Sequence, residues 1–374
     1  MHIVQIVPSI GPGSGVAGVA AQLEEQFLAL GHTTEALTED RLTPHGPPPQ
    51  SRLLHAVWRL NAAFAFSIVG GRRARRLLAQ EPHAVSICHN GALAGDVYVN
   101  HGVIAETMRN RGHGLWRMMR NPLHLFTHLR DRHRYHGRTH RAVVALTEEE
   151  AAVLRRVYGR VRPPVHVIGH GVDLDAHHPP TPAERAAARE RLGLDDEHRV
   201  ALFIGHELDR KGLGLLIDAL TEAPTVMLLV VGGYRSAVDR MTARAKRRGV
   251  ADRVLFVGPH VDLAPWFAAA DMFSLPSAYE SYGLVFTEAL ASGLPVIATR
   301  VGAAASLIVD GRNGYLVAPD PHQIADRLET LAATHVDEWR DACRASVSHL
   351  TWRATAERYV ELLTELALTE RGRA

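Results

Sequence analysis

The chain has 374 residues, of which 46% are hydrophobic and 22% charged, and its formal net charge at pH 7 is +2. This length allows two domains of ordinary size, and the composition is that of a soluble globular protein. No apolar run reaches the roughly 18 residues of a membrane-spanning helix and residues 1–10 form no basic leader, so we expect a cytoplasmic protein. The two cysteines, Cys88 and Cys343, predict neither a disulfide framework nor a metal site.

Short apolar runs alternate with longer helical patterns along the chain, which indicates parallel strands joined by helices. The first half predicts strands near residues 2–7, 84–88, 142–146 and 165–168, and a mobile proline-rich loop at 41–52. The second half predicts strands near residues 200–204, 226–231, 254–257, 272–275, 295–298 and 315–317. Because the prolines of residues 174–184 block regular structure, we expect two doubly wound α/β domains, residues 1–178 and 179–350, and a last helix in 351–374.

Residues 275–302 are the most informative segment, because they place Glu280 and Glu288 around a loop that runs into a helix. At the start of a helix, backbone donors lack partners and the macrodipole is positive, so a diphosphate can bind there. The donors would come from Tyr282, Gly283, Leu284 and Val285. Glu288 would accept hydrogen bonds from vicinal hydroxyls such as those of a ribose, and Glu280 would lie nearer a transferred sugar. By itself, such a pair of glutamates is typical of a solvated helix face.

Residues 13–18 form a literal G-x-G-x-x-G after the first strand, with Glu39 and Asp40 at the distance of a dinucleotide-binding fingerprint. The five residues between Val7 and Gly13 argue against that interpretation, because the fingerprint begins in the tight turn at the end of the strand. The alternatives are a structural turn and a loop whose amides, at Ser14 and Gly15, approach a nucleotide sugar.

The segment 275–302 resembles the Glu-x7-Glu signature of the retaining glycosyltransferases of family 4. The resemblance covers nearly the whole chain, through VNHG (99–102), HGVD (170–173), GHELDRKG (205–212) and GRNGYLV (311–317). It implies the GT-B fold, in which two Rossmann-like domains face each other across a cleft and the last helix crosses back to the first domain. It also implies a retaining transfer of sugar from a nucleoside diphosphate sugar to an acceptor hydroxyl, without metal or other cofactor.

The resemblance assigns roles to individual residues. His101 in VNHG would contact and orient the transferred sugar, with a structural histidine as the alternative. Lys211 would neutralise the leaving diphosphate. The family usually has arginine where this chain has His206, so Arg210 would supply the second cation unless it is a solvated loop charge. No residue in these motifs is an obvious covalent nucleophile, which favours a front-face mechanism.

Other functions remain open at this point. A sugar-nucleotide epimerase or a nucleotide-sugar-binding protein could share the GT-B architecture, and an NAD-dependent dehydrogenase would follow from the loop at residues 13–18. The acceptor could be a membrane glycolipid, an envelope precursor or a small secondary metabolite. Several of the 23 histidines have metal-ligand spacing, but none has a convincing third ligand, so we expect no metal site.

Residues 109–141 contain nine arginines and one acidic residue, with apolar side chains between them. Such a segment can lie on an anionic membrane surface, here the inner face of the cell membrane, or bind an acidic acceptor. An arginine-rich solvated helix pair is the alternative. No nucleic-acid-binding module accompanies the segment, so we expect no nucleic-acid partner.

Overall fold

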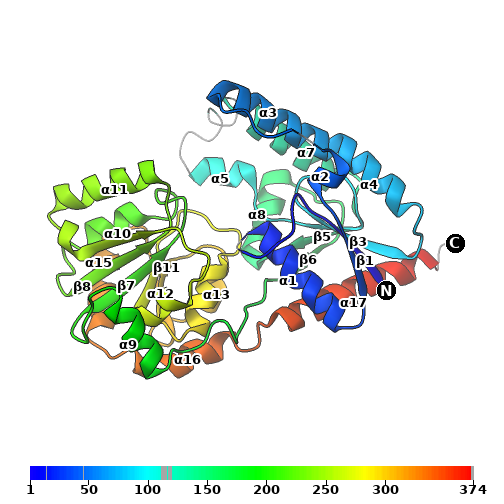
Figure 1. Ribbon diagram of the computed structural model, residues 1–374. Coiled ribbons are helices and arrows are strands. Elements are labelled where there is room, and N and C mark those ends of the chain that lie inside the picture. The colour runs from blue at the N-terminus through cyan, green and yellow to red at the C-terminus, as the bar shows by residue number, and fades with distance from the viewer. Residues whose placement is uncertain (14, 45, 111–115, 117–119, 372–374) are drawn as a thin grey trace. The chain divides into compact units, whose positions relative to one another are not determined.

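The computed structural model describes residues 1–13, 15–44, 46–110, 116 and 120–371. It divides into two compact units, Met1–Gly171 with Trp352–Ala374 and Val172–Thr351 (Figure 1). The first boundary therefore lies after residue 171, where the sequence prediction put it after 178. The intervening residues belong to the second unit because Arg344 donates hydrogen bonds of 2.9 and 3.1 Å to the carbonyls of His177 and Leu174.

The first unit is built on a six-stranded parallel sheet with the order β2-β1-β3-β4-β5-β6. Its strands are β1 (His2–Ile6), β2 (Thr33–Leu37), β3 (Ala84–His89), β4 (Val97–Val99), β5 (Ala142–Ala145) and β6 (Val165–Val167). The prediction found β1, β3, β5 and β6 but missed β2, a half-exposed edge strand with a polar sequence, and β4, which has three residues. Since β1 lies between β2 and β3, the strand order reverses between β1 and β3.

Helices cover both faces of this sheet (Figure 1). They are α1 (Val16–Ala29), α2 (Glu39–Leu42), α3 (Arg52–Ala65), the π-helix η1 (Phe66–Gly70), α4 (Gly71–Leu78), α5 (Ile104–Asn110), α7 (Pro122–His136), α8 (Glu148–Tyr158) and α17 (Trp352–Arg371). The last helix, α17, packs against α1 on one face, while α3, α4 and α7 lie on the other (Figure 1). In the predicted loop at 41–52, the described residues from 43 to 51 are irregular.

The second unit repeats the architecture with the strand order β12-β11-β10-β7-β8-β9. Its strands are β7 (Arg199–Ile204), β8 (Val226–Val231), β9 (Val254–Gly258), β10 (Met272–Leu275), β11 (Val296–Thr299) and β12 (Gly314–Val317). All six coincide with predicted strands, because all are mainly apolar runs, fully or largely buried in the central strands and partly buried in the edge strands β9 and β12. Here the strand order reverses between β7 and β10.

The helices of the second unit pack its apolar core on both sides of the sheet. They are α9 (Pro182–Glu190), α10 (Leu213–Ala219), α11 (Arg235–Arg248), the 3-10 helix η2 (Ala251–Arg253), α12 (Ala264–Ala269), α13 (Leu284–Ala291), α14 (Ala304–Leu307), α15 (Pro321–Ala332) and α16 (Asp337–Val347). No helix in the described residues combines the length and apolar composition needed to cross a bilayer.

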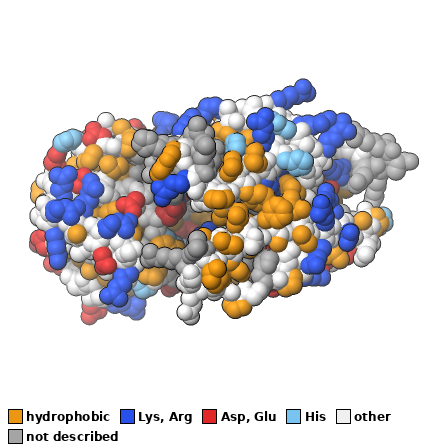
Figure 2. All heavy atoms as spheres, turned by 90° about the horizontal axis from the view of Figure 1, so that it is seen from above, with side chains coloured by type: hydrophobic (Ala, Val, Ile, Leu, Met, Phe, Trp, Pro, Cys, Tyr) orange, Lys and Arg blue, Asp and Glu red, His pale blue; other side chains and the backbone are white. Residues whose placement is uncertain are grey.

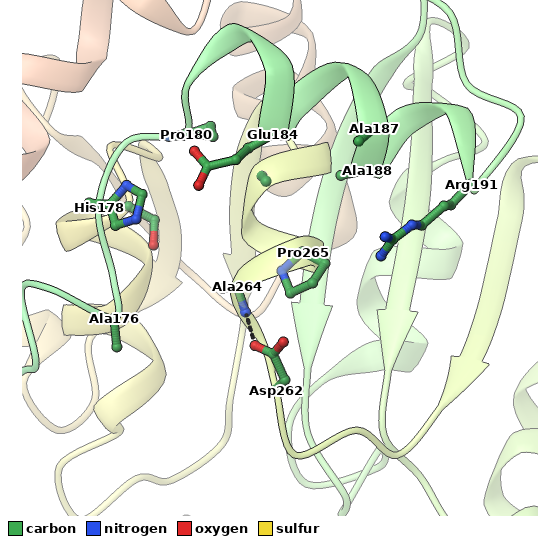
Figure 3. Close-up of a pocket in the computed structure, with 12 residues that line it drawn as sticks. Ala176, His178, Pro180, Glu184, Ala187, Ala188, Arg191, Asp262, Ala264 and Pro265 are labelled. Carbon is green, nitrogen blue, oxygen red and sulfur yellow. Dashed lines mark hydrogen bonds between the residues drawn. The ribbon is translucent and has the colours of Figure 1, made fainter.

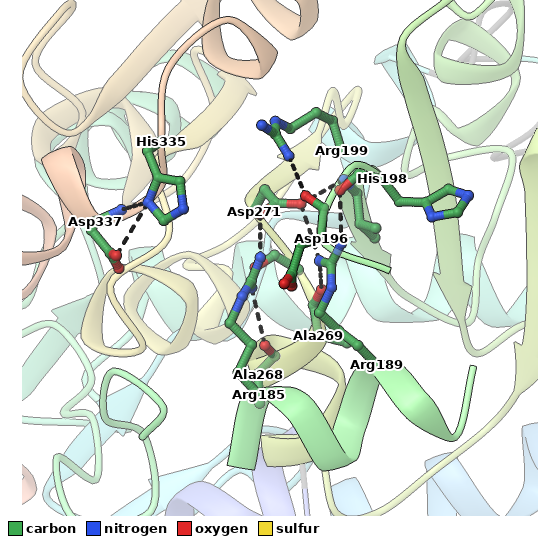
Figure 4. A network of polar contacts seen from close by, with 12 residues as sticks. Arg185, Arg189, Asp196, His198, Arg199, Ala268, Ala269, Asp271, His335 and Asp337 are labelled. Carbon is green, nitrogen blue, oxygen red and sulfur yellow. Dashed lines mark hydrogen bonds and ion pairs between the residues drawn. The ribbon is translucent and has the colours of Figure 1, made fainter. Parts of the chain in front are cut away.

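A buried ion cluster attaches α9 to the start of β10. Arg185 and Arg189 point from α9 toward Asp271 (Figure 4). Asp271 Oδ1 accepts from Arg185 Nη2 at 2.5 Å, and Oδ2 accepts from Arg189 Nη1 at 3.4 Å and from the Val200 N–H at 2.8 Å. Only 2% of Arg189 is exposed, so its buried positive charge is stabilised by this carboxylate and by nearby carbonyl oxygens.

Candidate active site

The loops that follow β7 and β10 bring together three charged side chains predicted for the site. Lys211 Nζ and Arg210 Nη1 lie 2.9 and 3.3 Å from the same oxygen, Oε1, of Glu280. Ser277, which the sequence analysis did not single out, donates to that oxygen from 2.7 Å. These strands are neighbours at the point where the strand order reverses, and in open parallel sheets ligands bind in the crevice at such a point.

Glycines allow the two loops to approach each other closely. A Cβ at Gly205 would lie 2.1 Å from Lys211 Cδ, and one at Gly212 would lie 2.1 Å from the carbonyl oxygen of Pro276. Gly212 also has a φ of +81°, which side chains rarely allow. The loop GHELDRKG therefore needs its glycines to place Lys211 against Glu280.

Two helices that begin at this edge of the sheet have no side-chain cap. Gly212 is the N-cap of α10 and Gly283 the N-cap of α13, both with positive φ. By contrast, Thr181 and Asp320 cap α9 and α15 with their side chains. First-turn N–H groups that hydrogen bond to no cap side chain can donate hydrogen bonds to an anion, and the helix dipole favours an anion at this end. The predicted donors Tyr282, Gly283, Leu284 and Val285 lie at the start of α13.

Glu288 lies one turn further into α13, in an unusual electrostatic environment. Its Oε2 is buried and, within the described part of the chain, has no hydrogen-bond partner, although the residue as a whole is partly exposed. Burial raises the pKa of Glu288 to about 7, and the charge of Lys211 opposes this rise. An acceptor without a donor is costly inside a protein, so this carboxyl is ready to bind a ligand that brings hydroxyl groups.

The remaining predicted residues belong to the first unit, except His206. Gly15 is the N-cap of α1 with a φ of +85°, and no side chain caps that helix. Ser14 lies outside the described residues. His101 follows β4 and is partly exposed, yet burial lowers its pKa to about 4. His206, in the second unit, is exposed, with its ring centroid 5.9 Å from that of Tyr234.

Two histidines that had no predicted role accompany His101. Its Nε2 lies 3.3 Å from Nδ1 of His89, the last residue of β3, and its ring stacks on that of His170 with centroids 5.7 Å apart. The sequence offered a signal for both, since His89 directly follows the strand predicted near residues 84–88 and His170 begins the HGVD motif.

Not all arginines of the basic segment 109–141 are exposed. Arg130 and Arg134 are buried and share Oδ1 of Asp131 at 2.9 Å. Arg134 also donates to the carbonyl of Ala92 and lies 3.7 Å above the ring of Tyr98. The prediction that this segment presents its arginines to a partner is therefore wrong for Arg130 and Arg134, which stabilise the first unit. Arg111 and Arg117 lie outside the described residues.

One pocket of the second unit lies between α9 and α12 and has a volume of about 240 Å³ (Figure 3). His178, Glu184 and Asp262 line it, and none of the described residues predicted for the site does. A second pocket of about 240 Å³ reaches Arg210 and Gly212. Pocket volume therefore does not distinguish the two places, whereas the charged side chains converge beside the pocket that includes Arg210.

Comparison with known proteins agrees with this arrangement. Residues 198–334 match the family described as glycosyl transferases group 1. These residues lie within the second unit. The matched residues include the Lys211–Glu280 pair and Glu288.

Curated relatives are similar over part of their length. A D-inositol 3-phosphate glycosyltransferase of Xylanimonas cellulosilytica is 39% identical over 60% of this chain and 57% of its own length. A second, from Catenulispora acidiphila, is 36% identical over 57% of this chain and 53% of its own length. The chain spans a little over half the length of these relatives.

Solved structures extend the similarity to the whole fold. WaaG, a glycosyltransferase involved in lipopolysaccharide biosynthesis, has a TM-score of 0.78 at 20% identity, covering 97% of this chain and 99% of its own. Sucrose-phosphate synthase from Thermosynechococcus elongatus has a TM-score of 0.74 at 21% identity, covering 99% and 100%. Together with the two parallel sheets, these similarities confirm the predicted GT-B fold. The comparisons favour a sugar-transferring enzyme over the epimerase that the sequence left open.

Proposed function

We propose that this protein is a retaining, metal-independent glycosyltransferase that moves a sugar from a nucleoside diphosphate sugar to an acceptor hydroxyl. The observation that carries the proposal is the convergence of Lys211 and Arg210 on Glu280 beside the uncapped start of α13. Arg210 also pairs with the more exposed Glu207 at 2.6 Å, so the carboxylates hold the two cations in place, and the helix start adds backbone donors for an anion. Such a site suits a diphosphate.

The same groups would stabilise the leaving group. As the bond between the sugar and the phosphate breaks, negative charge grows on the departing phosphate oxygen, and Lys211 and Arg210 would stabilise that charge. Glu280 is held by three donors on one oxygen, which fixes its carboxylate to orient sugar hydroxyls. In this front-face step, the acceptor oxygen bonds to the anomeric carbon, the electron pair of the broken bond goes to the phosphate, and the phosphate oxygen takes the acceptor's proton.

Glu288 would bind the ribose of the nucleotide. Its buried Oε2 accepts no hydrogen bond from the described residues, and vicinal ribose hydroxyls are donors. A nucleotide that supplies these donors would relieve the cost of the buried acceptor, so binding would be coupled to the ionisation of Glu288.

A panel of nucleoside diphosphate sugars tests the function, with nucleotide release and thermal shift as readouts. We expect one donor to raise the melting temperature and to release nucleotide faster when a suitable acceptor is added. Lys246→Ala is a matched control for Lys211→Ala, because these are the only two lysines and Lys246 is exposed in the last turn of α11. If no donor binds, or if both lysine variants behave alike, the proposed site is wrong.

The acceptor side is proposed to lie near an anionic membrane surface. Exposed apolar side chains gather among arginines on the face formed by α3 and α7 (Figure 2). They are Leu54, Val57, Phe64, Leu125 and Leu129. Phe64 of α3 also contacts Phe126 of α7, with ring centroids 5.5 Å apart, so the two helices form one surface. An apolar strip bordered by cations is the pattern of an interfacial helix.

Co-sedimentation with vesicles tests this part separately. We expect salt-sensitive binding to anionic vesicles and none to neutral ones, because each exposed arginine contributes about 1 kcal/mol within a Debye length of roughly 8–10 Å. Reversing the exposed Arg120 and Arg132 to Glu should weaken binding and leave donor hydrolysis unchanged. If no binding is seen at low salt, the acceptor is soluble and the membrane proposal fails.

A further inference from the structure

Three side chains that can bind a metal ion meet near the amino edge of the first sheet. His2 Nε2 lies 3.1 Å from Glu81 Oε2 and 3.8 Å from Glu35 Oε2. Each of the three residues offers one ligand atom, and these atoms all lie within 4.8 Å of one another. We call these three residues the His2 triad. The predicted site residue His101 follows β4 at the opposite, carboxyl edge of the same sheet, so the His2 triad is separate from it.

The register of the strands brings the His2 triad together. His2 opens β1 and pairs with Thr33 of β2, and Glu35 is two residues further along β2, on the same face of the sheet. Glu81 belongs to the connection between α4 and β3, and β3 pairs with β1 on its other side. The His2 triad therefore joins the edge strand β2 to β1 and to the segment that precedes β3.

The distances within the His2 triad suit a tetrahedral zinc ion. Zinc binds histidine nitrogen and carboxylate oxygen at about 2.0–2.2 Å, so its tetrahedral ligand atoms are about 3.3–3.6 Å apart. The distances of 3.1 and 3.8 Å from His2 Nε2 lie on either side of this range, and small rotations of these partly exposed side chains would complete the geometry. The two carboxylates would also balance the divalent charge of the ion.

Two neighbouring side chains orient the ligand atoms. His2 Nδ1 lies 3.0 Å from Thr33 Oγ1, and a proton that Nδ1 donates to this hydroxyl leaves the lone pair on Nε2, where a metal needs it. Arg41 Nη1 pairs with the other oxygen of Glu35, Oε1, at 2.5 Å. Partners of this kind fix the tautomer of a metal-binding histidine and the direction of a metal-binding carboxylate.

We propose that the His2 triad is a zinc site, in which His2 Nε2, Glu35 Oε2 and Glu81 Oε2 bind one Zn²⁺. His2 and Glu81 also line a hollow of about 620 Å³, from which a water molecule can supply the fourth ligand. The ligands are far apart in sequence, so the expectation of no metal site, which considered closely spaced histidines, did not include them.

The zinc ion would stabilise the first unit and take no part in sugar transfer. It would fasten the polar edge strand β2, which is hydrogen bonded to a neighbour on one side only. The unfolded chain does not hold the three ligands together, so binding to the folded state raises its stability by mass action. The inference is independent of the proposed function, which requires no metal.

Zinc binding to the intact protein, prepared without an affinity tag and freed of metal with a chelator, tests the proposal. By isothermal titration calorimetry we expect one Zn²⁺ per chain at neutral pH. The melting temperature should rise by about 5–10 °C when free zinc is about 100 times its Kd. In crystals grown with zinc, an anomalous peak should lie about 2.0–2.2 Å from His2 Nε2 and from an oxygen of each glutamate.

Variants of the ligands and of their neighbour assign the binding to the His2 triad. Thr33→Val keeps the shape of the side chain but removes the hydroxyl, so it should weaken zinc binding by about 10–100-fold. His2→Gln and Glu81→Gln remove a ligand and should weaken it further. His166→Gln is the matched control and should bind zinc as the parent does, because His166 is also a partly exposed strand histidine but lies on the opposite edge strand, β6.

Two results would overturn the proposal. If the parent protein binds no zinc at neutral pH, the His2 triad is only an ion pair of a protonated His2 with two carboxylates. If His2→Gln and Glu81→Gln bind zinc as tightly as the parent, other groups among the 23 histidines hold the ion. The anomalous peak is located in the parent protein, so the test does not depend on the folding of any variant.

Discussion

Replacing Glu288 with Gln should stabilise the protein at alkaline pH while weakening nucleotide binding. Burial raises the pKa of Glu288 from the ordinary 4.5 to about 7. Between these values the folded state binds more protons than the unfolded state, so stability falls as pH rises. The contribution is fully present below about pH 4.5 and is lost as pH rises through about 7. Each tenfold change in proton affinity corresponds to about 1.4 kcal/mol, so the loss is at most about 3.5 kcal/mol.

Urea unfolding at pH 5 and at pH 8.5 measures this loss. Gln has nearly the shape of protonated Glu and cannot ionise, so Glu288→Gln should match the parent at pH 5 and exceed its stability by about 2–3 kcal/mol at pH 8.5. Comparing the two proteins at each pH cancels the titration of every other group. A variant that is less stable than the parent at pH 8.5 would show that the carboxylate has a stabilising partner and would refute the argument.

The same variant tests the ribose contact. Because ribose hydroxyls donate to the carboxylate, nucleotide affinity of the parent should rise as pH increases through about 7, and the affinity of Glu288→Gln should be lower and independent of pH in that range. Glu288→Ala should lose about 1.5–3 kcal/mol of nucleotide binding. Isothermal titration calorimetry with the nucleoside diphosphate measures both, and parental affinity in either variant would rule out the contact.

Four further variants test the electrostatics of the two units. Lys211→Ala should lower turnover about 100-fold and change donor affinity less, since the contact of the lysine with the diphosphate strengthens as charge develops there. A larger loss of turnover in Arg210→Ala would show that Arg210 is the main residue that stabilises the leaving group. Asp271→Ala should cost about 3–5 kcal/mol in urea unfolding because it leaves the buried Arg189 without its carboxylate, and a cost below 1 kcal/mol would contradict this. Glu150→Gln should raise the free energy of unfolding by a few kcal/mol at pH 9 but not at pH 5, because burial raises the pKa of Glu150 to about 8. Equal effects on unfolding at both pH values would exclude titration of Glu150 as the cause.

The sequence predicted the second unit better than the first for a physical reason. A central parallel strand buried on both faces is a continuous apolar run, and β7, β8, β10 and β11 of the second sheet have this character, while the partly buried edge strands β9 and β12 are also mainly apolar. In the first unit, β2 lies at the sheet edge with the sequence TTEAL, and β4 is three residues long. Neither leaves a periodic signal, because tertiary pairing rather than composition makes them strands.

Charge composition gave a wrong prediction where the partners of a charged side chain are distant in sequence. Arg134 belongs to an arginine-rich segment that looks solvated, but its guanidinium binds the carbonyl of Ala92, 42 residues away, as well as Asp131. Local sequence shows neither the carbonyl nor the ring of Tyr98 beneath the guanidinium. Lys211 and Glu280 are 69 residues apart, and the family resemblance rather than any local pattern made their encounter predictable.

The hydrogen-bonded contacts among Gln5, His89 and His101 were beyond local sequence reasoning for a related cause. These residues lie at or near the carboxyl ends of β1, β3 and β4, and only the parallel order β1-β3-β4 brings those ends together.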